Sequence, residues 1–145
     1  MKKSIFFGLM TLVFIGSQSI CAQEMVAKKH ENPQWYNIVH IDYHSGTYSK
    51  ALGIIDKYYR KASEKAGTNM PAMIIELNTG PYDSMAVWHM KDGIESMNWD
   101  ISPDNIKWRE ALNEIAGGKD KADEIIKEYQ SYVASSTNSI GRLRD

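Results

Sequence analysis

Two histidines and an aspartate alternate along one extended segment, "QWYNIVHIDYHSG", at residues 34–46. Alternate residues of a β-strand point to the same face, so a strand here places His40, Asp42 and His44 side by side. An imidazole beside a carboxylate can act as a base or orient a ligand, because small changes in its surroundings move its charge across neutral pH. Imidazoles and carboxylates also bind metal ions. The segment therefore predicts either a ligand site or a metal site.

The spacing of these side chains disfavours a metal ion. A strand rises by about 3.3 Å per residue, which separates His40 from His44 by about 13 Å, too far for one ion. A metal site would need His40, Asp42 and Glu76 together, or ligands from two protomers. The sequence contains no phosphate-binding glycine loop and no zinc-protease helix signature. We therefore predict neither a metal nor a cofactor.

The first 22 residues have the pattern of a secretory signal peptide. Lys2 and Lys3 precede a mostly apolar run at residues 5–15, and small and polar residues follow. The run is shorter than the ~20 residues that span a bilayer. Cleavage between Ala22 and Gln23 fits this pattern. We expect export through the Sec route to a periplasmic or secreted location, with no membrane span in the mature protein.

Cys21 is the only cysteine of the chain and would leave with the signal peptide. A lipid-modified Cys21 is an alternative, which the bulky Ile20 before it disfavours. A mature chain without cysteine has no disulfides and no thiol catalysis. Removal of Lys2 and Lys3 leaves 15 basic and 18 acidic side chains, a formal charge of −3. This balance, without a basic tract, argues against nucleic-acid binding.

Hydrophobic periodicity and turn residues predict a single α+β domain at residues 34–145, after a flexible leader at 23–33. The expected elements are a strand at 35–44, a helix at 48–66, hairpin arms at 72–79 and 84–90, a short helix at 94–99, helices at 103–116 and 120–133, and a strand at 139–143. Thr47 and Ser102 are the expected N-caps, and Gly67 and Gly117 end two helices. This order matches the ferredoxin-like split βαβ arrangement with a four-stranded antiparallel sheet, which exposes one sheet face.

The placement of "WYNIVHIDYHSGTYSKALGIIDKYY" before "VWHMKDGIESMNW" resembles the dimeric α/β barrel superfamily, whose best-known branch is the antibiotic biosynthesis monooxygenase group. The resemblance covers most of residues 35–143 and rests on layout and composition. It implies a homodimer in which two sheets pair face to face around a cavity. Some members oxidise small phenolic or quinone-like compounds without a metal, and others have no known catalysis.

The same superfamily includes haem-degrading oxygenases, which use an asparagine on the first strand and a tryptophan and a histidine in the later helical region. The resemblance places Asn37 and Trp99 on the first two positions. No histidine follows His89 in this chain, so the third position is not matched. Haem degradation is therefore not expected.

The predicted alternation assigns the strand residues to two faces. Val39, Ile41, Met73, Ile75, Leu77, Met85 and Val87 are expected on the helix-covered face, with His89 as an interior histidine. The expected cavity face comprises Ile38, His40, Asp42, Ile74, Glu76, Asn78, Ala86, Trp88 and Met90. On that face we predict a ligand-binding set of His40, Asp42, Glu76, Asn78 and Trp88. Alternatively, these polar groups only satisfy one another across a partly wet interface.

These observations lead to two functional hypotheses. The first is an exported protein that binds a small organic molecule between the sheets of a homodimer, with a cofactor-independent monooxygenase-like enzyme as one form of it. The second is a non-catalytic envelope protein whose sheet face serves only dimer assembly or partner binding. Catalytic residues are not identified by any motif in the sequence. One fold hosts many functions, so only the site can separate the two hypotheses.

Overall fold

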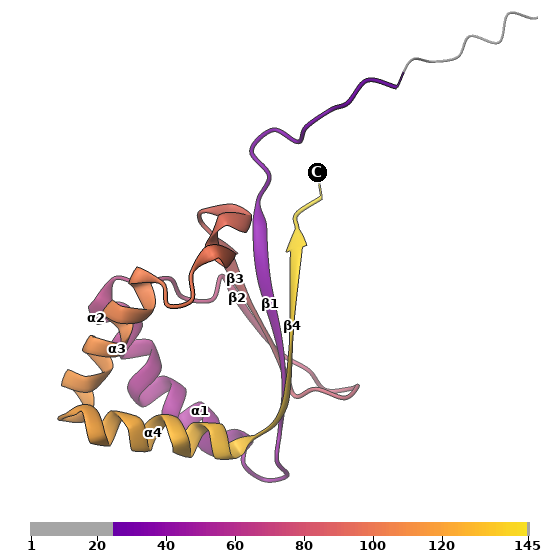
Figure 1. Ribbon diagram of the computed structural model, residues 1–145. Coiled ribbons are helices and arrows are strands. Elements are labelled where there is room, and N and C mark those ends of the chain that lie inside the picture. The colour runs from indigo at the N-terminus through magenta and orange to yellow at the C-terminus, as the bar shows by residue number, and fades with distance from the viewer. Residues whose placement is uncertain (1–24, 145) are drawn as a thin grey trace, which may run out of the picture.

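The computed structural model describes residues 25–144 of the 145-residue chain. The predicted signal peptide at 1–22 and Cys21 lie outside the described residues. Residues 25–34 form no helix or strand and lead into the domain from one end (Figure 1). Within residues 25–144, no helix is long and apolar enough to cross a membrane.

Four antiparallel strands form the sheet. They are β1 (Trp35–Tyr43), β2 (Met73–Glu76), β3 (Ser84–Met90) and β4 (Val133–Arg142), in the order β2-β3-β1-β4. β1 pairs with β3 on one side and with β4 on the other, and β2 pairs with β3 at the edge. β1 and β3 are thus adjacent in the centre of the sheet, as the split βαβ arrangement requires. The predicted α+β fold with a four-stranded antiparallel sheet is confirmed.

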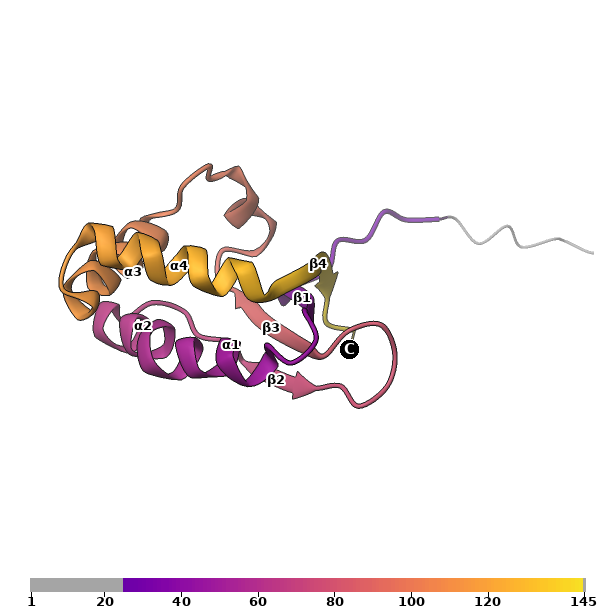
Figure 2. The ribbon, with the colours of Figure 1, turned by 90° about the horizontal axis from the view of Figure 1, so that it is seen from below.

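The helices all lie on one side of this sheet (Figure 1). Between β1 and β2 run α1 (Tyr48–Ile54), the π-helical turn η1 (Ile55–Tyr59) and α2 (Arg60–Ala66), without a break. After β3 come the 3₁₀ segment η2 (Gly93–Asn98), α3 (Pro103–Ala116) and α4 (Lys119–Tyr132). From below, α1 and α2 form one row and α3 and α4 another, and both rows lie next to one end of the sheet (Figure 2).

The helix ends follow the sequence signals in most places. Ser102 accepts a hydrogen bond from the Asn105 backbone N–H at 3.1 Å, as an N-cap should. Gly67 and Gly117 adopt left-handed backbone angles, with φ of 62° and 81°, and end α2 and α3. Thr47 does not cap α1 through its side chain. Its hydroxyl instead donates to the carbonyls of His44 and Tyr132, which fixes the end of β1 against the end of α4.

The last strand is longer than predicted. β4 begins at Val133, directly after α4, and pairs with all of β1 from Trp35 to Tyr43. The prediction placed only residues 139–143 in a strand, because the stretch "ASSTNS" lacks alternating apolar residues. Its neighbour β1 supplies a complete row of backbone donors and acceptors, and this tertiary pairing overrides the weak local preference.

The helices share a core that is separate from the sheet. Its fully or nearly fully buried residues are Ala62 on α2, Ala111 and Leu112 on α3, and Ala122 on α4. Alanines at three of these four positions let the helix axes approach closely, and Leu112 fills the space between them. Aromatic rings connect this core to the sheet: Tyr59 packs on Trp108 and Tyr129, and Tyr129 packs on Tyr43 of β1.

Candidate functional site

The strand register determines which side chains share a face. Val39 lies opposite Ala86, Asn37 opposite Trp88, and Ile41 opposite Ser84. Directly opposed residues of antiparallel strands point to the same face. Tyr43 packs against Tyr48 of α1 and Tyr129 of α4, so the face of the odd-numbered β1 residues is the one toward the helices.

Two names follow from this register. The open face, away from the helices, carries Tyr36, Ile38, His40, Asp42, Met73, Ile75, Met85, Val87, His89, Ser135, Thr137, Ser139 and Gly141. The helix-side face carries Trp35, Asn37, Val39, Ile41, Ile74, Glu76, Ser84, Ala86, Trp88, Met90, Ser136, Asn138, Ile140 and Arg142.

The predicted site residues are therefore divided between the two faces. His40 and Asp42 lie together on the open face, as expected. Glu76 and Trp88 lie on the helix-side face, and Asn78 is exposed in the loop after β2. The expectation that the five side chains share one face is wrong. The expected core positions of Met73, Ile75, Met85, Val87 and His89 are wrong for the same reason.

The cause is the composition of β2 and β3. Both are apolar on both faces, with "MII" at the start of β2 and "SMAVWHM" as the whole of β3. Such strands contain no polar–apolar alternation that would identify the covered face, and a shift of one residue exchanges the faces. The alternation in β1 was clearer, and its two faces were assigned correctly.

On the open face, both histidines pack against tyrosines. The His40 ring lies 5.2 Å from the ring of Tyr82, which reaches over from the loop between β2 and β3. The Tyr82 hydroxyl is 3.1 Å from the hydroxyl of Thr137 on β4. The His89 ring lies 5.3 Å from the ring of Tyr36. Tyr82 had no signal in the sequence, because its place over β1 depends on the path of a loop.

On the helix-side face, a groove of about 390 Å³ runs between the sheet and the end of α4. It is lined by Val39, Ile41, Tyr129, Gln130, Val133 and Ser136. The groove is shallow and open, and its walls are mainly apolar, with an amide, a phenol and a hydroxyl among them. The sequence did not predict this groove, since it depends on the unexpected start of β4 at Val133.

On the same face of β1, Asn37 has an unsatisfied polar atom. It precedes Val39 by two residues on the same face of β1 and lies opposite Trp88. Its side-chain carbonyl Oδ1 is buried and has no hydrogen-bond partner among the described residues. Buried polar atoms are nearly always paired, so an unpaired one indicates a missing partner or a functional strain.

The tyrosines between sheet and helices are strongly perturbed. Burial raises the pKa of Tyr59 to about 12, an effect that the nearby Arg109 partly offsets. Burial also raises the pKa of Tyr129, as does its hydrogen bond with the Tyr43 hydroxyl at 3.1 Å. Burial, and then the negative charge of Glu76, raise the pKa of Tyr48. These phenols are therefore neutral hydrogen-bonding groups at physiological pH.

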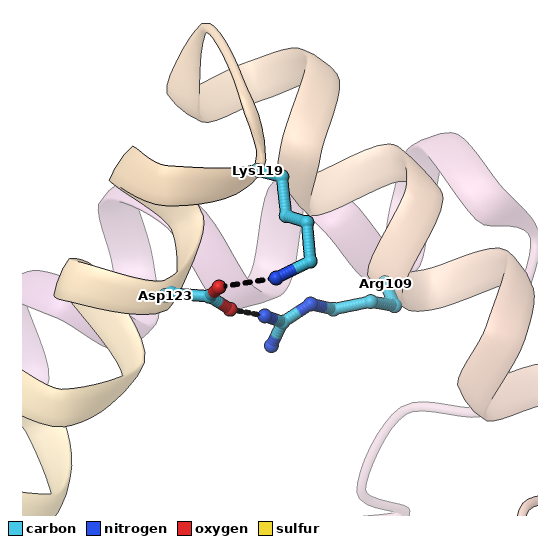
Figure 3. A network of polar contacts seen from close by, with 3 residues as sticks. All are labelled: Arg109, Lys119 and Asp123. Atoms are coloured by element: carbon cyan, nitrogen blue, oxygen red, sulfur yellow. Dashed lines mark hydrogen bonds and ion pairs between the residues drawn. The ribbon is translucent and has the colours of Figure 1, made fainter.

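Other polar contacts in this region are structural. Arg109 of α3 and Lys119 both pair with the Asp123 carboxylate of α4, Lys119 at 2.6 Å (Figure 3). The Arg109–Asp123 pair joins α3 to α4, whereas the Lys119–Asp123 pair lies within α4. Among residues 25–144, no three side chains of the His, Cys, Asp and Glu types come together as a metal site would require.

No protein-family model matches this chain, and no curated protein does. It is similar to the solved structure of a NIPSNAP family protein with unknown function from Agrobacterium tumefaciens, with 12% identity over 79% of this chain and 91% of that chain and a TM-score of 0.50. A dimeric protein of unknown function with a ferredoxin-like fold from Bacteroides fragilis gives 10% identity over 76% of this chain and 96% of that chain, with a TM-score of 0.42. A putative antibiotic biosynthesis monooxygenase from Nitrosomonas europaea gives 9% identity over 74% of this chain and 95% of that chain, with a TM-score of 0.40. At 12% identity, the likeness to the Agrobacterium tumefaciens structure shows a shared fold.

Proposed function

We propose that this protein binds a small, largely apolar organic molecule in the helix-side groove, and that two copies associate through their open faces. The observation that carries the binding proposal is the mainly apolar groove between the sheet and the end of α4. Its lining also offers the Gln130 amide, the Tyr129 phenol and the Ser136 hydroxyl as hydrogen-bonding groups. The ligand is thus expected to combine an apolar body with at least one hydrogen-bonding group.

The lining of the groove supports binding rather than acid–base chemistry. None of its six side chains is an imidazole or a carboxylate. Its phenol, Tyr129, has a raised pKa and stays neutral at physiological pH. A monooxygenase-like reaction, as the superfamily resemblance implies, would have to rely on a reactive substrate rather than on a base in this groove.

The proposed dimer rests on the apolar part of the open face, which lies on β1, β2 and β3, whereas β4 contributes serines and a threonine. Met73 is 54% exposed and Ile75 is 37% exposed there, next to Ile38, Met85 and Val87. A contiguous apolar surface of this kind is typical of an interface. A two-fold symmetric dimer uses the same patch on both copies, so the open face needs no second surface to complement it.

The open face alone is too small for a standard dimer interface, so another segment must contribute to the contact. Four strands about 4.8 Å apart and about seven residues long make a face of roughly 19 by 23 Å. That flat area of roughly 440 Å² is about half of the ~800 Å² that a standard interface buries on each partner. The loop at 77–83 projects from the sheet on the side away from the helices (Figure 1). It is positioned to contact the second copy and to supply the rest.

A second candidate is an assembly protein without a ligand. The same apolar open face favours it, since a dimer or partner interface needs no groove. A cavity between the two sheets, where we first predicted the ligand, would contain His40 and Asp42 but neither Glu76 nor Trp88. The helix-side groove therefore has more of the properties of a ligand site.

A larger side chain in the groove distinguishes the ligand-binding protein from the assembly protein. Ser136 lines the groove, whereas Ser131 lies on the exposed surface of α4. We expect Ser136→Trp to weaken binding of the fluorescent probe 1-anilinonaphthalene-8-sulfonate at least tenfold, and Ser131→Trp to leave it unchanged. Titration calorimetry should give one probe site per protomer for the unaltered protein. Equal affinity in both variants would exclude the groove as the binding site and favour the assembly protein.

We also propose that the protein is exported and that residues 1–22 are removed. The support is the charge and hydropathy pattern of the N-terminal sequence. The intact mass of the protein isolated from its own cells should correspond to a chain that begins at Gln23. A mass that includes residues 1–22 would exclude cleavage there, and a diacylglycerol adduct would indicate a lipid-modified Cys21.

A further inference from the structure

Two of the four histidines of the chain lie on the open face within strands, His40 near the middle of β1 and His89 near the end of β3. His40 lies in β1 between Met85 of β3 and Thr137 of β4. His89 lies in β3 opposite Tyr36. Both side chains are half-buried already in one protomer. The other two histidines, His30 before β1 and His44 after it, are exposed.

Among the described residues, no carboxylate forms an ion pair with His89. Its ring packs on the neutral ring of Tyr36, and the Asn69 amide donates to its backbone carbonyl. Lys91 follows two residues later in the chain and carries a charge of the same sign. Packing this imidazole against a second apolar sheet would remove water from it, and burial disfavours the charged form of a histidine.

The surroundings of His40 include groups that favour its neutral form and a group that favours its charged form. The Tyr82 ring covers one side of the imidazole, and the hydroxyl of Thr137 and the side chain of Met85 lie beside it. Asp42, two residues along on the same face, is an anion that would favour a protonated His40. Burial in the dimer and the Asp42 charge would therefore act in opposite directions at His40, whereas at His89 burial would act without a carboxylate that opposes it.

We propose that the association of two protomers through their open faces is pH-sensitive, and that protonation of His89, with a smaller contribution from His40, separates them at mildly acidic pH. This inference rests on the homodimer proposed above. Histidine gains its proton between about pH 8 and pH 5. Because the separated protomers would bind more protons than the dimer, proton uptake shifts the equilibrium toward them as the pH falls.

Sedimentation velocity of the mature chain at pH 7.5 and pH 5.5 tests this inference. We expect the dimer dissociation constant to rise at least tenfold between the two pH values. Phenylalanine keeps the flat ring but cannot take up a proton, so His40→Phe with His89→Phe should reduce the change to less than about twofold. His89→Phe alone should remove more of the change than His40→Phe alone. His44→Phe and His30→Phe are matched controls and should keep the full change.

The possible results separate the two proposals. A protein that is monomeric at pH 7.5 overturns the homodimer and this inference with it. A dimer with the same dissociation constant at both pH values overturns the inference and leaves the homodimer intact. A pH dependence that His44→Phe or His30→Phe removes, and the double variant keeps, also overturns it. Circular dichroism at each pH confirms that the variants are folded before their association is compared.

Discussion

The two faces of this sheet are built from the same four strands but differ in what covers them. On the helix-side face, Ala86, Met90 and Ser84 are buried, and the groove lies beside them at the end of α4. On the open face, the central strands are half-buried and the edge residues Met73 and Ile75 are exposed. An apolar residue is thus not a sign of the core in this protein. Its neighbours across the strands decide whether it faces helices or a free surface.

The largest expected effect is on the dimer dissociation constant, and two adjacent isoleucines of β2 allow it to be measured. Ile75 lies on the open face and Ile74 on the helix-side face of the same edge strand, where it is 56% exposed. We expect Ile75→Asp to raise the dimer dissociation constant at least about 100-fold, because the dimer would bury a carboxylate in place of an apolar side chain. Ile74→Asp should change it by less than about threefold. Light scattering over a dilution series measures both values.

This pair of variants also tests the face assignment itself. Both substitutions place the same charge at adjacent positions of one strand, so differences in propensity and in net charge cancel. Equal weakening by both variants would show that β2 contributes to association through its edge or its fold rather than through its open face. An unchanged dimer in both variants would place the interface elsewhere on the molecule.

The residues that the sequence misplaced show why a face is hard to predict. The split βαβ order and the phase of β1 could be derived, because β1 alternates between Val39 or Ile41 and His40 or Asp42. The phase of β2 and β3 could not be derived, since both faces of those strands are apolar. As a result, His40 and Asp42 were grouped correctly, and Glu76 and Trp88 were assigned to the wrong face. The register depends on the loop at 77–83 and on pairing between distant segments, which local patterns do not encode.

The second largest expected effect is on stability and concerns Asn37. This residue lies on the helix-side face, and its Oδ1 is buried and has no partner among the described residues. Leucine has the same branching at Cγ and no acceptor, so Asn37→Leu removes a polar atom whose burial without a partner costs free energy in the free protein. We expect the free energy of unfolding, measured with urea, to rise by about 1 kcal/mol. The same variant should bind the anilinonaphthalene probe no more tightly. A loss of stability instead would mean that Asn37 makes a hydrogen bond to water in the free protein.

The smallest expected effect contrasts the response of the two faces to pH. Acid should act on the open face, whereas alkali should act on the tyrosines between the helix-side face and the helices. Burial raises the pKa of Tyr59 to about 12, above the value near 10 that it has in the unfolded chain. The stabilising contribution is therefore complete below about pH 10 and is lost as the pH rises toward 12. Because Tyr59 is only half-buried, we expect a loss of less than about 1 kcal/mol at pH 11. Tyr59→Phe should reduce the fall in unfolding free energy between pH 9 and pH 11, as measured with urea. An identical fall in both proteins would show that Tyr59 ionises in the folded state as readily as in the unfolded chain.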